Sequence, residues 1–325
     1  MISALRSEIQ KTVETYCAEP IHRETMLRAL SCPGFALHPE AKCRAGLLTL
    51  EVYKAIQGTL NATAFWAAIA TELYMEAAYI FDQVADHELD QADGLSAAEE
   101  LALAIGLMSC GAAMGYEAAR QADSNERCIR SLLQLHQDCI NSSSGQFLDA
   151  RAQKLHLGTT NEAIQITCLK SGSLGRLATS FAANIATDES QTIKLFEEFG
   201  FNLFTYMQLV DDIRDACPEN TPHTDLGQHK KTLPLVYFFN FLVEDASVTN
   251  SDIMSPDSGV PISQKVRQAF KASGAEVFSA IVAETFLNRA KSNLADLRDR
   301  VIMVDSLEQL VSSVEFNPNE IMAVS

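Results

Sequence analysis

The chain has 325 residues, of which 47% are hydrophobic and 21% are charged, and its formal net charge is −17. This composition is typical of a globular protein and excludes an intrinsically disordered chain. The excess of acidic residues repels polyanions, so we expect no nucleic acid partner. The eight cysteines form no CxxC pair and no zinc-like spacing, which predicts reduced thiols and a cytoplasmic protein.

The N-terminal third predicts neither a signal peptide nor a membrane anchor. The first twenty residues lack a basic segment followed by an apolar run, so no secretory signal is expected. The most apolar stretch, residues 62–81, contains Glu72 and Glu76. Because charges inside a membrane span are costly, we interpret this stretch as a buried helix and expect no transmembrane segment.

The middle of the chain has the pattern of consecutive helices. The 178 residues between Pro39 and Pro218 contain no proline, whereas usage of about 5% would give roughly nine. Apolar residues recur there at intervals of three and four, as in Phe65, Ile69 and Leu73, which is the period of an amphipathic helix. The sequence therefore predicts an all-α fold. Helix breaks are expected near residues 32–34, 57–58, 91–94, 141–145, 158–161 and 187–189.

Two polar stretches interrupt the last third of the chain, at residues 217–228 and 244–263. The apolar helical pattern resumes after each stretch, so we interpret both as long surface loops. This continuity predicts a single domain over residues 1–325.

Acidic residues occur in two clusters near the ends of apolar helical segments. Asp82 and Asp86 are one turn apart and share a helix face, where two carboxylates repel each other unless a cation lies between them. A solvated helix end is the structural alternative for this pair. The second cluster is denser, with Asp211, Asp212 and Asp215 at positions i, i+1 and i+4. Three carboxylates in this arrangement match Mg²⁺, which prefers oxygen ligands and shares them with substrate phosphates.

Basic residues near these clusters are candidate phosphate ligands. Arg214 lies within the second cluster and offers a structural alternative, since it could neutralise the aspartates. Lys230 and Lys231 precede a predicted helix, where they could bind diphosphate oxygens or lie in solvent. Lys170 is the only charged residue between Glu162 and Arg176. A lysine in such an apolar segment needs an anionic partner, either a substrate or a structural carboxylate.

These motifs occur in the order and spacing of a known family. They are Asp82-x3-Asp86, Gly145-Gln146-x2-Asp149, Lys170-Ser171, Gln208-x2-Asp211-Asp212-x2-Asp215 and Asp225-x4-Lys230-x-Thr232-x-Pro234. Over residues 30–245 the chain resembles the trans-isoprenyl diphosphate synthases, or polyprenyl synthetase family. The resemblance implies an isoprenoid synthase-type helical bundle around a deep apolar central cavity, with the two aspartate motifs facing each other across its mouth. It also implies a homodimer.

The resemblance assigns roles by position. Metal ligands for Mg²⁺ are expected at Asp82, Asp86, Asp211, Asp212 and Asp215. Catalytic roles are expected for Asp82, Asp86, Asp211, Asp212, Lys170 and Lys230. Substrate contacts are expected at Lys42, Arg44, Ala77, Ala78, Gln83, Gln146, Lys170, Gln208 and Lys230. Small residues at 77 and 78 predict room for a prenyl tail of about fifteen carbons or more, although close helix packing explains paired alanines equally well.

The chain departs from the family at the site for isopentenyl diphosphate. The first motif has Gln83 where the family has a second aspartate, and Met75 replaces a histidine. The family's Gly-Lys-x-x-Arg-Pro stretch is at best residues 42–45, and no Lys or Arg occurs between Lys54 and Arg120. In these losses, and in the run from Leu169 to Leu174, the chain resembles divergent branches such as the ComQ-type peptide prenyltransferases. We therefore expect isopentenyl diphosphate to be a poor acceptor.

The predicted activity is a Mg²⁺-dependent prenyl transfer that ionises an allylic isoprenyl diphosphate and releases pyrophosphate. Two alternatives remain at this point. A terpene cyclase would use the same site without a second substrate. A catalytically silent partner subunit of a prenyl diphosphate synthase would explain Gln83 and the missing arginines, but not the intact second motif.

Overall fold

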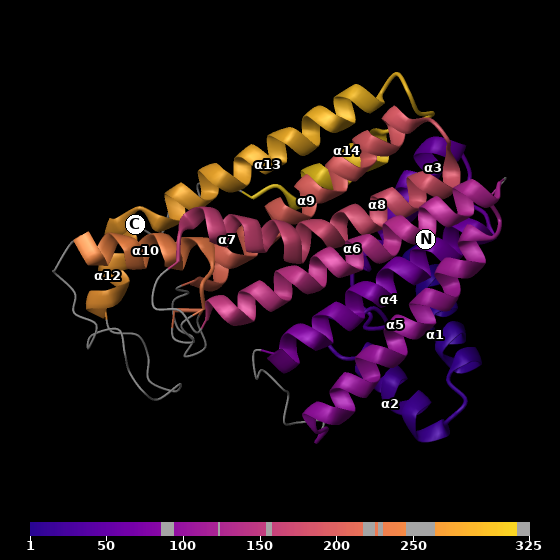
Figure 1. Cartoon of the computed structure of the whole chain (residues 1–325), viewed down its shortest axis with the longest axis horizontal. Helices are drawn as coiled ribbons and strands as arrows, with labels where there is room; N and C mark the ends of the chain where they lie inside the picture. Colours follow the sequence, from indigo (N-terminus) through magenta and orange to yellow (C-terminus); the bar gives the residue numbers. More distant parts are fainter. Residues whose placement is uncertain are drawn as a thin grey trace.

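A computed structural model describes residues 1–85, 94–122, 124–153, 158–216, 225–226, 230–244 and 264–316 (Figure 1). Every regular element in these ranges is a helix, which confirms the predicted all-α fold. The α-helices are α1 (Ile2–Tyr16), α2 (Pro20–Leu30), α3 (Arg44–Gln57), α4 (Ala62–Ala85), α5 (Ala97–Ala119), α6 (Asn125–Ala152), α7 (Thr160–Thr167), α8 (Ser173–Ala186), α9 (Ser190–Ala216), α10 (Leu233–Glu244), α12 (Gln264–Ser273), α13 (Ala275–Leu297) and α14 (Asp305–Val314), and a π-helix, η1 (Cys168–Gly172), joins α7 to α8.

Helix α8 lies at the centre of the bundle. All residues from Leu177 to Ala186 are buried, and the helix contacts α3, α4, α6 and α9. Neighbouring helices therefore cover this part of α8 on every side, as expected of a core helix. Helices α5 and α13 lie on opposite sides of the molecule, with α5 packed on α4 and α13 packed along α9 (Figure 1).

Helices α8 and α9 approach each other unusually closely. A Cβ atom on Gly175 would overlap the carbonyl oxygen of Gly200, and a Cβ on Gly200 would overlap that of Gly175. The two glycines therefore bring the backbones of α8 and α9 into contact. This contact fixes α9, which carries the second aspartate cluster, against the central helix.

Most predicted helix breaks are confirmed. Helix α2 ends at Leu30, just before the Pro33-Gly34 pair. Helix α3 ends at Gln57 and is capped by Gly58 in the left-handed conformation. Helix α7 begins after a capping box at Thr159, and the segment at 187–189 separates α8 from α9. The break at 91–94 lies outside the described residues except for its last position, and most of the two predicted surface loops also lies outside them.

The predicted break at 141–145 is wrong, because α6 continues through it. Small and polar residues there indicated a turn, but they serve a close contact instead. The hydroxyl of Ser142 donates to the carbonyl oxygen of Lys170 at 2.8 Å. A Cβ on Gly145 would lie 2.7 Å from the Cα of Lys170, so only glycine lets η1 pack this closely on α6.

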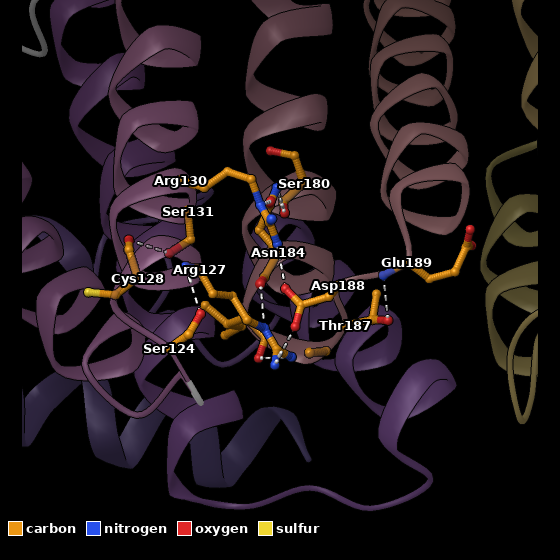
Figure 2. A network of polar contacts seen from close by, with 12 residues as sticks. Ser124, Arg127, Cys128, Arg130, Ser131, Ser180, Asn184, Thr187, Asp188 and Glu189 are labelled. Carbon is orange, nitrogen blue, oxygen red and sulfur yellow. Dashed lines mark hydrogen bonds and ion pairs between the residues drawn. The ribbon is translucent and has the colours of Figure 1, made fainter.

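A buried arginine anchors the C-terminal end of α8 (Figure 2). Arg127, on α6, is only 5% exposed. Its guanidinium donates to the carbonyl oxygens of Asn184 at 3.1 Å and Ile185 at 3.0 Å. The last carbonyls of a helix have no partner within the helix, so this arginine supplies the donors that they lack.

Helix α5 has an exposed apolar side. Within the part of the chain that the structure describes, it is the one helix long and apolar enough to cross a membrane by length and composition, and 33% of its most apolar window is buried. Core helices of soluble proteins also meet this criterion. Here α5 packs along α4 and also contacts α6.

Candidate active site

The side chain of Lys170 lies between two carboxylates. Its ammonium nitrogen is 2.6 Å from Oδ1 of Asp82, on α4, and 3.0 Å from Oδ2 of Asp149, on α6. Burial alone would lower the pKa of Lys170, but the two carboxylates, Asp82 first, outweigh burial and raise it. The lysine therefore carries a full positive charge. The prediction that it needs an anionic partner is confirmed, and the partners within the protein are the carboxylates of Asp82 and Asp149.

The next residue contacts the other aspartate cluster. The hydroxyl of Ser171 donates to Oε1 of Gln208 at 2.9 Å. The amide nitrogen of Gln208 donates in turn to Oδ1 of Asp212 at 2.8 Å. Consecutive residues of η1 thus reach both helices that carry the aspartates, α4 through Lys170 and α9 through Ser171.

The π-helix makes this double contact possible. Its hydrogen bonds span one residue more than those of an α-helix, which widens the turn and redirects the side chains. Gly172 fits at its end because a Cβ there would lie 2.5 Å from Oγ1 of Thr205 and 3.0 Å from the ring of Phe201. The sequence placed Lys170 on an ordinary helix, so the π-turn was not predicted.

Asp212 is buried in this network and is 7% exposed. Its pKa is raised to about 8, chiefly by burial and also by the charge of Asp225, while the hydrogen bond from Gln208 and the charge of Lys170 oppose this rise. The carboxyl is therefore mostly protonated at neutral pH when no cation lies beside it. A divalent cation at this position would stabilise the ionised form.

Asp211 lies at the more exposed side of the same cluster. Burial raises its pKa, and Arg44 and Arg214 partly oppose this effect. Arg214 is 3.5 Å from Oδ1 of Asp211, and Arg44 is 4.0 Å from Oδ2. Arg214 thus lies beside Asp211, where the structural alternative would place it. This alternative does not extend to Asp212, whose hydrogen bond comes from Gln208.

Lys230 lies near the second cluster through Asp225. The backbone N–H of Asp225 donates to the carbonyl oxygen of Asp215 at 3.0 Å, which places Asp225 beside the C-terminal end of α9. The ammonium of Lys230 is 3.6 Å from Oδ1 of Asp225. Asp215 is exposed, and Asp225 is 8% exposed.

The remaining predicted residues have the following positions. Lys42 is exposed just before α3, and Gln83 is half-buried beside Asp82. Ala77 is buried and Ala78 partly exposed in α4, and Asp86 lies outside the described residues. The amide nitrogen of Gln146 is buried and has no hydrogen-bond partner among the described residues, so it is available to donate to a ligand oxygen.

The donor chemistry of the site fits Mg²⁺ shared with a phosphate. No three Asp, Glu, His or Cys side chains in the described ranges converge on a metal position. Asp82 lies on α4, and Asp211 and Asp212 lie on α9, so each helix offers carboxylate oxygens for part of a coordination shell. Mg²⁺ is usually held by one or two carboxylates, with phosphate and water oxygens completing its octahedron. Asp212 also has the burial and raised pKa that a nearby cation would relieve.

Two residues that make contacts in the site, Asp149 and Ser171, were given no role in the sequence analysis. Both residues lie in motifs that the resemblance singled out. The signal available was the isolated charge of Lys170, which required an anionic partner but could not show which one.

The chain is similar to known proteins in both sequence and fold. Residues 36–257 match the family model described as polyprenyl synthetase. A decaprenyl-diphosphate synthase from Dictyostelium discoideum is 25% identical over 256 residues, which cover 73% of this chain. The chain spans about half the length of that relative, 53%.

Solved structures share the fold at low identity. A geranylgeranyl pyrophosphate synthetase from Geoglobus acetivorans has a TM-score of 0.73 and 20% identity, covering 97% of this chain and 98% of that one. A decaprenyl diphosphate synthase from Rhodobacter capsulatus has a TM-score of 0.77 and 17% identity, covering 96% of this chain and 94% of that one. With the family model matching more than half of the chain, the protein belongs to the polyprenyl synthetase family.

Proposed function

We propose that this protein is a Mg²⁺-dependent prenyltransferase that ionises an allylic isoprenyl diphosphate and transfers the prenyl group to an acceptor. The observation that carries this proposal is the junction at η1, where Lys170 meets Asp82 and Ser171 is linked through Gln208 to Asp212. Carboxylates from α4 and α9 and a lysine are thereby brought to one place. Membership of the polyprenyl synthetase family supports the same chemistry.

Each residue has a distinct role in the proposed reaction. Asp82, Asp211 and Asp212 would hold the cation, and Lys170 and Lys230 would bind diphosphate oxygens as point charges. A bound Mg²⁺ would withdraw charge from the diphosphate and so weaken the allylic C–O bond. The C–O electron pair leaves with pyrophosphate, a new bond forms to the acceptor, and pyrophosphate accepts the proton that the acceptor loses.

The acceptor is not expected to be isopentenyl diphosphate. A second diphosphate beside the first needs compensating cations, because its desolvated charge is otherwise costly. The side of the site near α3 offers Lys42 and Arg44, and Arg44 already lies 4.0 Å from Asp211. Glu72 and Glu76 are buried one turn apart in α4 behind this region and are 3% and 5% exposed.

The proposal is tested by measuring pyrophosphate release from geranyl, farnesyl and geranylgeranyl diphosphates, each with and without isopentenyl diphosphate. We expect release that depends on Mg²⁺ and falls by orders of magnitude in Asp212→Ala. Asp296→Ala, an exposed aspartate on α13, is the matched control and should retain full activity. Near-normal turnover in a folded Asp212→Ala variant would contradict the site assignment.

The same assay separates the alternatives. A terpene cyclase would release pyrophosphate without any acceptor and yield a cyclic hydrocarbon. A silent partner subunit would release none. Saturable formation of longer linear diphosphates at micromolar isopentenyl diphosphate would identify an ordinary chain-elongating synthase and refute the expectation for the acceptor.

We also propose that the protein forms a homodimer through α5 and α6. Apolar side chains on one stripe of each helix are exposed: Leu101, Ile105 and Tyr116 on α5, and Ile129, Leu133, Ile140 and Phe147 on α6, which are 38% to 66% exposed. The rings of Tyr116 and His136 lie 6.5 Å apart and join the two stripes. Such a continuous apolar face is unusual on a monomer.

Sedimentation velocity tests the dimer. Leu133→Glu should produce monomers. Ile281→Glu, an equally exposed apolar residue on α13 at 63%, should leave the dimer intact. Monomeric wild-type protein at micromolar concentration would contradict the proposal.

A further inference from the structure

Lys170 forms an ion pair with Asp82, the carboxylate that the proposed function assigns to a divalent cation. Lys170 and Asp149 are each 20% exposed at the side chain, and Asp82 is 36% exposed. The Nζ to Oδ1 distance of 2.6 Å makes the contact with Asp82 a hydrogen-bonded ion pair. Lys170 is therefore a counter-ion of Asp82 in the protein without ligands.

The backbone of Lys170 is fixed, but its side chain can move. Its carbonyl oxygen accepts the Ser142 hydroxyl at 2.8 Å, and its Cα packs directly on Gly145. Ser142, Gly145 and Asp149 follow each other at i, i+3 and i+7, so one face of α6 holds both the backbone and the ammonium of this lysine. Any exchange of partners must occur through the four-carbon side chain.

We infer that Lys170 is a transferable counter-ion and that Asp149 is the positioning residue that retains it. This inference rests on the proposed function. When a divalent cation takes Asp82, the ammonium is repelled from that carboxylate but stays bound to Asp149. The N–H donor of Lys170 that no longer bonds to Asp82 can then bind a diphosphate oxygen.

This exchange couples cation binding to diphosphate binding. A cation arriving alone must displace Lys170 from Asp82, which weakens its binding. A diphosphate gives the displaced ammonium a new partner and so removes that cost. By thermodynamic linkage, each ligand must then strengthen the binding of the other.

The test measures Mn²⁺ binding to the full chain by electron paramagnetic resonance without diphosphate. Lys170→Met removes the competing ammonium and keeps the length of the side chain, so Mn²⁺ should bind about three- to tenfold more tightly, the usual range for a hydrogen-bonded, partly buried ion pair. Asp149→Asn confines the ammonium to Asp82, so Mn²⁺ should bind more weakly. Lys194→Met, which removes the exposed ion pair with Glu198 on α9, is the control and should change nothing.

The opposite shifts distinguish this role from a structural one, since a merely structural lysine and aspartate would change Mn²⁺ binding in the same direction or not at all. Lys170→Gln repeats the measurement if the methionine variant does not fold. If the wild type binds Mn²⁺ in the presence of inorganic pyrophosphate, unchanged or weaker Mn²⁺ binding in folded Lys170 variants overturns this inference but not the proposed function. Absence of Mn²⁺ binding in every form, with or without pyrophosphate, overturns both this inference and the proposed metal dependence.

Discussion

Replacing Arg127 with alanine should destabilise the fold strongly. The guanidinium is almost completely buried and donates to the carbonyl oxygens of Asn184 and Ile185 (Figure 2). Alanine would leave both oxygens buried without these donors. A hydrogen bond to a charged group contributes about 1.5–3 kcal/mol, so two of them correspond to about 3–5 kcal/mol after partial relaxation. The contact with Asp188 at 3.6 Å adds little, because that carboxylate is 63% exposed and is screened by solvent.

Arg130 provides the matched control on the same helix. It donates to Oδ1 of Asn184 at 2.8 Å and to Oδ1 of Asp188 at 3.0 Å, but its side chain is 39% exposed. Because solvent can replace these partners, Arg130→Ala should cost about 1 kcal/mol or less.

Urea denaturation followed by far-UV circular dichroism measures both free energies of unfolding. Since native domains are stable by only about 5–15 kcal/mol, Arg127→Ala should lower the midpoint clearly. Equal losses in the two variants would refute the reasoning, because burial of the guanidinium would then have no special effect.

Three further predictions concern the site and its surroundings. Burial raises the pKa of Glu72 to about 7 and that of its neighbour Glu76 well above 4.5, so the folded state retains protons that the unfolded state loses above pH 4.5. Stability should therefore fall as the pH rises from about 5 to 8, and Glu76→Gln should flatten this dependence in urea midpoints measured across that range; an unchanged slope would contradict the assignment. Gly145→Ala should displace η1 and lower turnover at least tenfold, since its Cβ would collide with the backbone of Lys170. The control is Gly94→Ala. A Cβ at this left-handed position would have no neighbour within 4 Å, so turnover should be retained. Ala77→Phe should shift substrate preference toward shorter allylic diphosphates in a competition assay, and an unchanged preference in a folded variant would favour helix packing as the reason for the small residue.

Much of the helical architecture follows from local sequence. The long interval without proline and the spacing of apolar residues predicted consecutive helices, and the structure has them. The motifs likewise placed Asp82 in the last turn of described α4 and Asp212 near the end of α9. These features depend on backbone propensity and periodicity, which each segment contains in itself.

The tertiary structure determined which contacts individual residues make. Ser142 and Gly145 have the composition of a turn, yet they lie within α6 because a small side chain and a hydroxyl were needed where η1 packs. The isolated charge of Lys170 required an anionic partner, but only the packing of α4, α6 and η1 selected Asp82 and Asp149. A residue's local propensity carries no information about which distant surface it will meet, and here that meeting determines the charges of the site.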